Sequence, residues 1–294
     1  MTRIIILSDP HLSPTHGFFW ENWLLVRDAA ARIEAACTIV NGDLCIDGPD
    51  SDAEMEFAAE ALRALPGTVL PLPGNHDVGD EPPGQDVRQL IDEPRLARWD
   101  RFIGADRWRH DLDGWTLLGV NAQLFGSGLA RETEQTDWLD AALADSRGQR
   151  IALILHKPLF IEQADEADPT IGSMGLAPRR DLMRRLAGAD TRLIVSGHLH
   201  THRDRVVEGI RHLWVPSCAF AGSHGYPDDP ACGFLTLDLD GDTVTTAAIR
   251  PQGLVSHDLA AIKQHGRYKF LREMPPCPPE LGSATQLALE QASR

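Results

Sequence analysis

Short apolar runs alternate with helical patterns through the first two-thirds of the chain. Apolar, β-branched runs such as 4–7 and 151–155 are typical of buried strands, and the segments between them have helical spacing. Ser51 followed by Glu54 predicts a capping box at the start of one helix. The pattern predicts strands over 4–7, 38–40, 68–72, 107–111, 115–121, 151–155 and 192–195, and helices over 20–36, 51–65, 95–103, 132–144 and 179–186.

The pattern becomes rich in short strands after the last of these elements. Residues 79–110 are rich in Pro, Gly and Asp and predict a loop or cap insertion, while 256–294 is weakly patterned. We therefore expect one domain over 1–255 and a peripheral C-terminal extension over 256–294. The alternation favours a layered α/β domain with two β-sheets between helices. The later strands are predicted over 205–207, 212–215, 233–239 and 243–249.

Charge and composition exclude several classes of protein. Among the 294 residues, 28 Lys and Arg face 43 Asp and Glu, giving a net charge of −15, which argues against general nucleic-acid binding. No apolar run approaches the roughly 20 residues of a membrane span. The N-terminal apolar stretch is too short for a signal peptide. Five cysteines without CxxC spacing favour reduced thiols. We expect a cytoplasmic protein that binds no membrane; the pattern leaves its oligomeric state open.

Candidate metal ligands follow five predicted strands, at the point where each strand ends. Ligands of α/β proteins gather outside the carboxyl ends of the strands, so residues far apart in sequence can converge on one sheet edge. Carboxylates can bridge two cations, and imidazole suits zinc, iron or manganese. Two such ions can clamp a phosphoryl group and ionise a water. The residues at these strand ends are Asp9, His11, Asp43, Asn75, His76, His156, His198 and His200.

The ordered set of these blocks resembles the signature of the calcineurin-like metallophosphoesterases. The blocks are Asp9-Pro10-His11, Gly42-Asp43, Gly74-Asn75-His76-Asp77, His156 and Gly197-His198-Leu199-His200, in a match over about 4–250. The resemblance implies a four-layered α/β/β/α sandwich of two mixed β-sheets flanked by helices, with a dinuclear centre of two divalent or trivalent ions, Mn, Fe or Zn. Gly42-Asp43-Leu44 with the later Asp47-Gly48 is closest in look to bacterial class III cyclic-nucleotide phosphodiesterases.

The same resemblance implies a role for each residue. It implies Asp9, His11 and His200 as ligands of the first metal ion, Asn75, His156 and His198 as ligands of the second, and Asp43 as the bridging carboxylate. His76 resembles the histidine that contacts phosphate and protonates the leaving oxygen. The expected function is hydrolysis of small phosphodiesters, of cyclic nucleotide or glycerophosphodiester type, by attack of a metal-bridging hydroxide.

Three questions stay open at the level of sequence. Asn121-Ala122-Gln123, with the later 134–139, resembles a branch with phosphomonoesterase members, so monoesters are an alternative substrate class. A non-catalytic, metal-bound interaction scaffold is a second alternative. Ile46 stands where many relatives have an acidic residue, so Asp47 or Asp77 is a candidate to orient His76.

Overall fold

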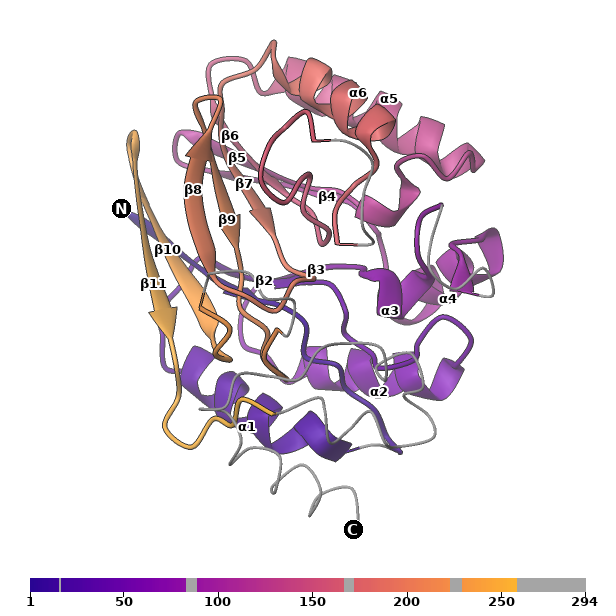
Figure 1. Ribbon diagram of the computed structural model, residues 1–294. Coiled ribbons are helices and arrows are strands. Elements are labelled where there is room, and N and C mark those ends of the chain that lie inside the picture. The colour runs from indigo at the N-terminus through magenta and orange to yellow at the C-terminus, as the bar shows by residue number, and fades with distance from the viewer. Residues whose placement is uncertain (16, 83–88, 167–171, 223–228, 258–294) are drawn as a thin grey trace.

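Two β-sheets lie face to face between layers of helices (Figure 1). The computed structural model describes residues 1–15, 17–82, 89–166, 172–222 and 229–257. The first sheet has the strand order β11-β10-β1-β2-β3. In it β1, β2 and β3 are parallel, whereas β10 is antiparallel to both of its neighbours. Its strands are β1 (Thr2–Leu7), β2 (Cys37–Asn41), β3 (Val69–Leu72), β10 (Phe234–Asp240) and β11 (Thr243–Ile249).

The second sheet has six strands in the order β4-β5-β6-β7-β9-β8. Its central strands β5, β6, β7 and β9 are parallel, and an antiparallel strand lies at each edge. Both sheets are therefore mixed. The strands are β4 (Trp108–Leu112), β5 (Trp115–Gly119), β6 (Arg150–Ile154), β7 (Thr191–Ser196), β8 (Arg203–Val207) and β9 (Ile210–Trp214).

The helices cover the outer faces of the two sheets (Figure 1). One layer, on the first sheet, contains α1 and α2, and the other, on the second sheet, contains α5 and α6. The helical elements are η1 (Gly17–Phe19), α1 (Trp20–Ala30), α2 (Asp52–Arg63), α3 (Asn75–Val78), α4 (Glu93–Phe102), η3 (Ala122–Leu124), α5 (Ala130–Asp145) and α6 (Leu176–Leu186).

The alternation of side chains along β1 shows how the layers are joined. Ile4 and Ile6 belong to the apolar core between the two sheets, whereas Ile5 and Leu7 belong to the core beneath the helices. Successive side chains of a strand point to opposite faces, so a strand buried on both faces reads as one continuous apolar run. A third core joins the second sheet to α5 and α6. The four-layered sandwich predicted from the sequence is confirmed.

Two local predictions are corrected. The helix predicted over 20–36 ends at Ala30, because the chain has to turn and enter the first sheet, where the amide of Ala36 donates to the carbonyl of Arg3 at 2.8 Å. Tertiary pairing here overrides the helix propensity of the Ala-rich segment.

The capping box is one-sided: Ser51 accepts from the amide of Glu54, but the carboxylate of Glu54 accepts from Ser13. The other predicted elements in the described residues lie in place, with bounds shifted by a few residues.

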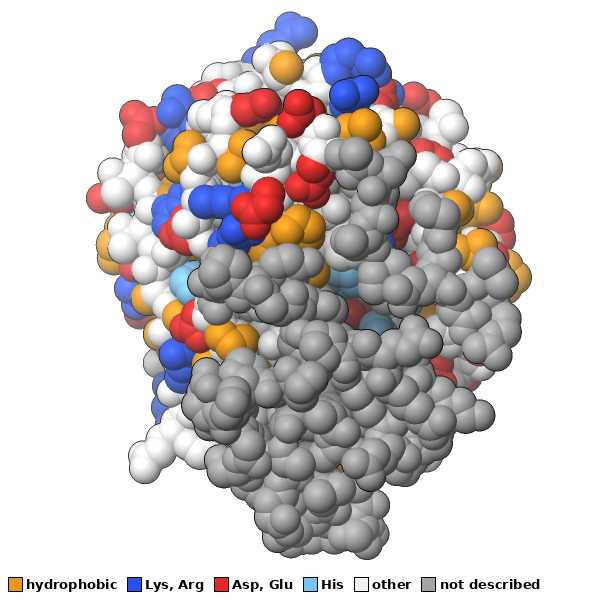
Figure 2. All heavy atoms as spheres, viewed as in Figure 1, with side chains coloured by type: hydrophobic (Ala, Val, Ile, Leu, Met, Phe, Trp, Pro, Cys, Tyr) orange, Lys and Arg blue, Asp and Glu red, His pale blue; other side chains and the backbone are white. Residues whose placement is uncertain are grey.

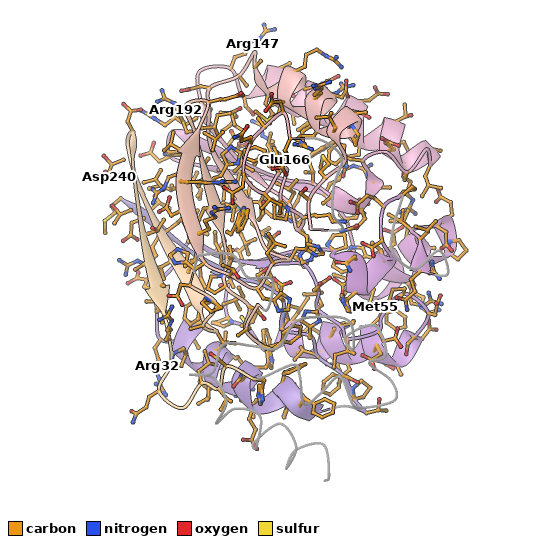
Figure 3. All side chains as sticks on the ribbon, in the orientation of Figure 1. Arg32, Met55, Arg147, Glu166, Arg192 and Asp240 are labelled. Carbon is orange, nitrogen blue, oxygen red and sulfur yellow. The ribbon has the colours of Figure 1, made fainter. Side chains whose placement is uncertain are left out.

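Apolar and charged side chains separate as the pattern requires. Met55 on α2 is buried in the core beneath the first sheet, while labelled charged side chains lie at the periphery (Figure 3): Arg32, Arg147, Arg192 and Asp240. On the face seen in Figure 2, acidic and basic side chains are interspersed, and histidine side chains show near its centre. In the described part of the chain, no helix is long and apolar enough to span a membrane.

Candidate metal centre

The carboxyl ends of strands from both sheets meet at one place. From the first sheet, β1 leads to Asp9 and His11, β2 to Asp43, and β3 to Asn75 and His76. From the second sheet, β6 leads to His156, and β7 leads to His198 and His200. The site therefore lies across the two sheets, at the edge predicted from the sequence.

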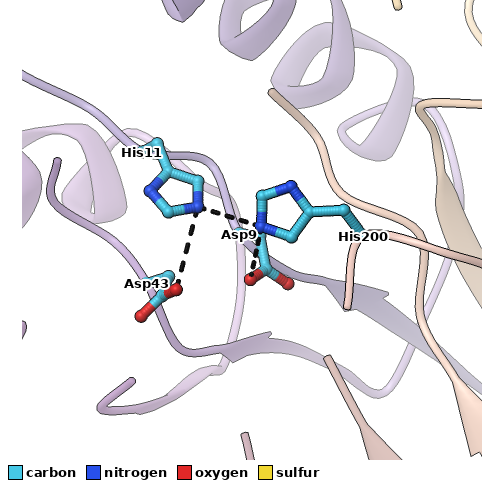
Figure 4. A group of neighbouring side chains, drawn as sticks. All are labelled: Asp9, His11, Asp43 and His200. Carbon is cyan, nitrogen blue, oxygen red and sulfur yellow. Dashed lines mark hydrogen bonds and ion pairs between the residues drawn. The ribbon is translucent and has the colours of Figure 1, made fainter. Parts of the chain in front are cut away.

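Four of these side chains form a compact, buried group (Figure 4). One ligand atom from each of Asp9, His11, Asp43 and His200 lies within 4.8 Å of the others. Nε2 of His200 is 3.2 Å from Oδ1 of Asp9, and Nε2 of His11 is 3.7 Å from Oδ2 of Asp43. The two Nε2 atoms are 3.1 Å apart. Carboxylate and imidazole groups this close offer a donor set for one cation.

A second group shares Asp43 with the first. Asp43, His156 and His198 also place ligand atoms within 4.8 Å of one another. Nε2 of His156 is 3.2 Å from Oδ2 of Asp43, and 3.8 Å from Oδ1 of Asp9. Oδ1 of Asn75, on the neighbouring turn, is buried with no hydrogen-bond partner among the described residues. Two adjoining donor sets that share one carboxylate are what a dinuclear centre requires.

The backbone at these positions adopts an unusual conformation. Five non-glycine residues of the site have positive φ angles: Asp9 (52°), His11 (45°), Asp43 (52°), His198 (68°) and His200 (53°). Left-handed backbone is uncommon for such residues, and it clusters at functional sites, where the surrounding structure holds it in place. The sharp turns after the strands bring both Asp9 and His11 into the first group, and they place His198 and His200 in the two adjoining groups.

Two glycines permit the close approach of these turns. A Cβ at Gly42, where φ is +83°, would lie 2.3 Å from Nδ1 of His156. A Cβ at Gly74 would lie 2.1 Å from Oδ1 of Asp43. No side chain fits at either place, so Gly42 and Gly74 allow the candidate ligands to pack closely against the turns.

Hydrogen bonds to backbone carbonyls fix two of the imidazoles. Nδ1 of His156 donates to the carbonyl of Asn41 at 2.7 Å, and Nδ1 of His200 donates to the carbonyl of Phe220 at 3.1 Å. A carbonyl oxygen can only accept, so the proton of each neutral ring is on Nδ1 and Nε2 carries a lone pair. Such outer hydrogen bonds orient histidines that bind metals.

The Nε2 lone pairs of His156 and His200 thus face carboxylate oxygens of Asp43 and Asp9. Two electron-rich groups this close need a positive charge between them. Burial lowers the pKa of His156, but the charges of Asp43 and Asp9 outweigh burial and raise it to about 10. Burial raises the pKa of Asp43, yet the neighbouring histidines hold it well below its ordinary value. In the free protein a proton on His156 supplies positive charge there, and a bound cation would replace it. The residues present therefore fit a metal centre.

His76 lies beside the cluster with its ring held separately. Its Nδ1 donates to the carbonyl of Ile46 at 2.7 Å, and its ring meets that of His11 edge-on at 4.8 Å between centroids. Its backbone amide donates to Oδ1 of Asp43 at 2.9 Å. The main-chain carbonyl of Ile46 therefore orients His76. The identity of the side chain at position 46 does not indicate this contact.

The two candidates from the sequence have other partners. The carboxylate of Asp77 accepts three backbone amides, those of Leu44, Cys45 and Gly74, and so ties the second motif to the third. Oδ1 of Asp47 accepts from the side chain of Gln89.

Surrounding charges perturb the acidity of His76. Burial lowers its pKa, but the charge of Asp43 and the hydrogen bond to Ile46 raise it, with smaller contributions from Asp80 and Asp77, and the net pKa lies above the ordinary value. This shift favours the protonated form of the imidazole.

The fold and the site define the class of protein. The profile of the calcineurin-like phosphoesterase family matches residues 2–202, and the chain belongs to that family. Membership supports phosphoesterase activity and binding of divalent metal ions, with the buried Asp and His cluster as the candidate site.

Among the relatives of this chain are proteins named as phosphatases and proteins named as phosphodiesterases. It is 27% identical over 173 residues to human serine/threonine-protein phosphatase CPPED1, covering 55% of this chain and 52% of the relative. It is 27% identical over 225 residues to a probable cyclic nucleotide phosphodiesterase of Rhodococcus erythropolis, covering 68% and 67%. The chain thus spans about half the length of the CPPED1 phosphatases that it matches. Purple acid phosphatase PPD1 from yellow lupin shares the fold, with a TM-score of 0.62 at 14% identity, over 87% of this chain and 52% of that one.

Proposed function

We propose that this chain hydrolyses small phosphodiesters, of cyclic nucleotide or glycerophosphodiester type, at a dinuclear metal centre. The observation that carries the proposal is the pair of donor groups that share Asp43. In this assignment the first ion is held by Asp9, His11 and His200, the second by Asn75, His156 and His198, and both by Asp43. Metal ions such as Mn, Fe or Zn would polarise the phosphoryl oxygens there and supply an ionised water at neutral pH.

His76 is the proposed general acid. A departing alkoxide is strongly basic and needs a proton, and histidine is the side chain that most often supplies one near neutral pH. Because Nδ1 of His76 donates to the carbonyl of Ile46, Nε2 is the ring nitrogen that would have to protonate the leaving oxygen. The charge of Asp43 and the hydrogen bond to Ile46 raise the pKa of His76, which favours the protonated ring that a general acid needs.

The charges near His76 favour a diester over a monoester. Lys157 is buried directly after His156, but its Nζ lies 2.6 Å from Glu81 and 3.6 Å from Asp80, so its charge is already neutralised. A phosphate monoester carries close to two negative charges at neutral pH, whereas a diester carries one. With Asp80 close enough to His76 to affect its pKa, a singly charged substrate meets less repulsion.

A comparison of two aryl phosphates tests this preference. On protein with quantified Mn²⁺, kcat/KM for bis-p-nitrophenyl phosphate should exceed that for p-nitrophenyl phosphate. Asp80→Asn should narrow the difference by removing a negative charge, and Asp113→Asn, at the turn between β4 and β5, should leave it unchanged. A preference for the monoester would contradict the proposal and favour a phosphatase, the function in the name of the human relative.

A non-catalytic scaffold is the remaining alternative. It predicts bound metal without turnover of either aryl phosphate. The retention of His76 beside a complete set of candidate ligands supports an enzyme instead.

A further inference from the structure

The ring of Phe220 packs against two of the proposed metal ligands. Its centroid lies 4.0 Å from that of His200 and 4.9 Å from that of His11, and the residue is only 8% exposed. An imidazole held on one side by a tightly packed aromatic ring cannot turn without opening a void or displacing its neighbour. The ring of Phe220 therefore restricts both imidazoles of the first proposed metal position.

The main chain of Phe220 acts on the same ligand. Its carbonyl accepts the Nδ1 proton of His200, so one residue fixes both the tautomer and the plane of that imidazole. The loop holding Phe220 is tied to the first motif as well, because Oγ of Ser217 donates to the carbonyl of Asp9 at 2.9 Å and accepts the amides of Ala219 and Phe220.

Asn22 connects this loop to the segment that follows β11. Its Nδ2 donates to the carbonyls of Ala219, at 3.0 Å, and Val255, at 2.7 Å, while its Oδ1 accepts the amide of Val255. Phe220 forms an isolated β-bridge with His257, whose ring also meets that of Phe19. Phe19 in turn contacts Phe220, at 5.2 Å between ring centroids. Phe220 is thus held by its own loop, by the segment after β11 and by Phe19.

We propose that Phe220 is a positioning residue for the half of the centre formed by Asp9, His11 and His200. The inference rests on the dinuclear site proposed above. It predicts that loss of the aromatic ring weakens one metal equivalent selectively, because the second proposed position is held by other groups. Nδ1 of His156 donates to the carbonyl of Asn41, and the ring of His198 packs edge-on against that of His156. Hydrogen-bonded outer partners of metal ligands are typically worth about 10–100-fold in metal affinity, and we take the same range for a ring that packs against two ligands.

Titration of the metal-free protein with Mn²⁺, with unbound Mn²⁺ counted by electron paramagnetic resonance, measures this directly. Wild type should bind two equivalents. Phe220→Leu keeps the carbonyl and removes the ring, and it should bind one equivalent as wild type does and the other about 10–100-fold more weakly. Phe220→Tyr, which keeps the ring, should restore wild-type affinity. Phe125→Leu, a buried control in the core beneath α5 and α6, should behave as wild type.

The outcomes separate this inference from the proposed function. Two equivalents bound by Phe220→Leu as tightly as by wild type, or both weakened equally, would overturn the positioning role. Wild type that binds fewer than two equivalents would instead contradict the dinuclear centre. If Phe220→Leu fails to fold by circular dichroism, Phe220→Met fills more of the space with a flexible side chain and makes the same comparison.

Discussion

Replacing His76 by alanine separates the chemistry of the site from its metal binding. In the proposed assignment His76 contacts substrate and neither metal ion, so His76→Ala should keep two metal equivalents and the fold. General acid catalysis is typically worth about 10²–10⁴-fold in rate, or about 3–5 kcal/mol in activation free energy. The 2.7 Å hydrogen bond from Nδ1 to the carbonyl of Ile46 fixes the orientation of the His76 ring.

The loss should depend on the leaving group. An alkyl ester leaves as a strongly basic alkoxide and needs the proton, whereas p-nitrophenolate is a far weaker base. The variant's kcat should therefore fall by a larger factor for a dialkyl phosphodiester than for bis-p-nitrophenyl phosphate. His110→Ala, on β4 at the edge of the second sheet, is the matched control and should leave both rates unchanged. Equal losses on the two esters would refute the acid role, and loss of metal would show that His76 is a ligand.

Three further predictions follow from the same structure. Asp43→Asn should reduce both metal equivalents together, because one carboxylate serves both donor groups; metal analysis that finds one equivalent intact would contradict the bridging role. Gly74→Ala should abolish turnover, because its Cβ would lie 2.1 Å from Oδ1 of Asp43, whereas Gly188→Ala, with open space around it, should be near wild type in the same assay. Burial and the charge of Arg205 lower the pKa of His212 from 6.5 to about 4, so the unfolded state binds the additional proton between these values. The free energy of unfolding should fall by up to about 3 kcal/mol as pH drops from about 6.5 to 4; urea unfolding of His212→Gln should show a smaller fall, and an equal fall would contradict the assignment.

The strand ends were predictable because two signals coincide there. Buried strands read as apolar runs, and polar residues directly after them mark the edge where ligands gather. Asp43 and His156 are 113 residues apart in sequence, but they follow β2 of the first sheet and β6 of the second, which end at the same edge. Oδ2 of Asp43 and Nε2 of His156 are therefore only 3.2 Å apart. The pattern therefore predicted two sheets between helices and the strand ends that meet at one edge, and the family resemblance added the four-layered sandwich.

The groups that hold the ligands were not predictable in the same way. The rings of His76, His156 and His200 are fixed by main-chain carbonyls, those of Ile46, Asn41 and Phe220 respectively. Every residue has a main-chain carbonyl, so residue identity does not indicate such a contact. Asp77 looked like a partner for His76 because it is adjacent and acidic, but the turn directs its carboxylate to backbone amides. Phe220 is distant in sequence from any motif, and only the packing of the loop after β9 reveals its contact with His11.

Turnover of bis-p-nitrophenyl phosphate as a function of bound metal tests the central claim most directly. Metal-free protein should be inactive, and the rate should rise with added Mn²⁺ until two equivalents are bound, with Asp43→Asn unable to reach that level. Hydrolysis that persists at full rate without metal, or two bound equivalents with no hydrolysis of the diester or the matching monoester, would contradict a dinuclear phosphoesterase.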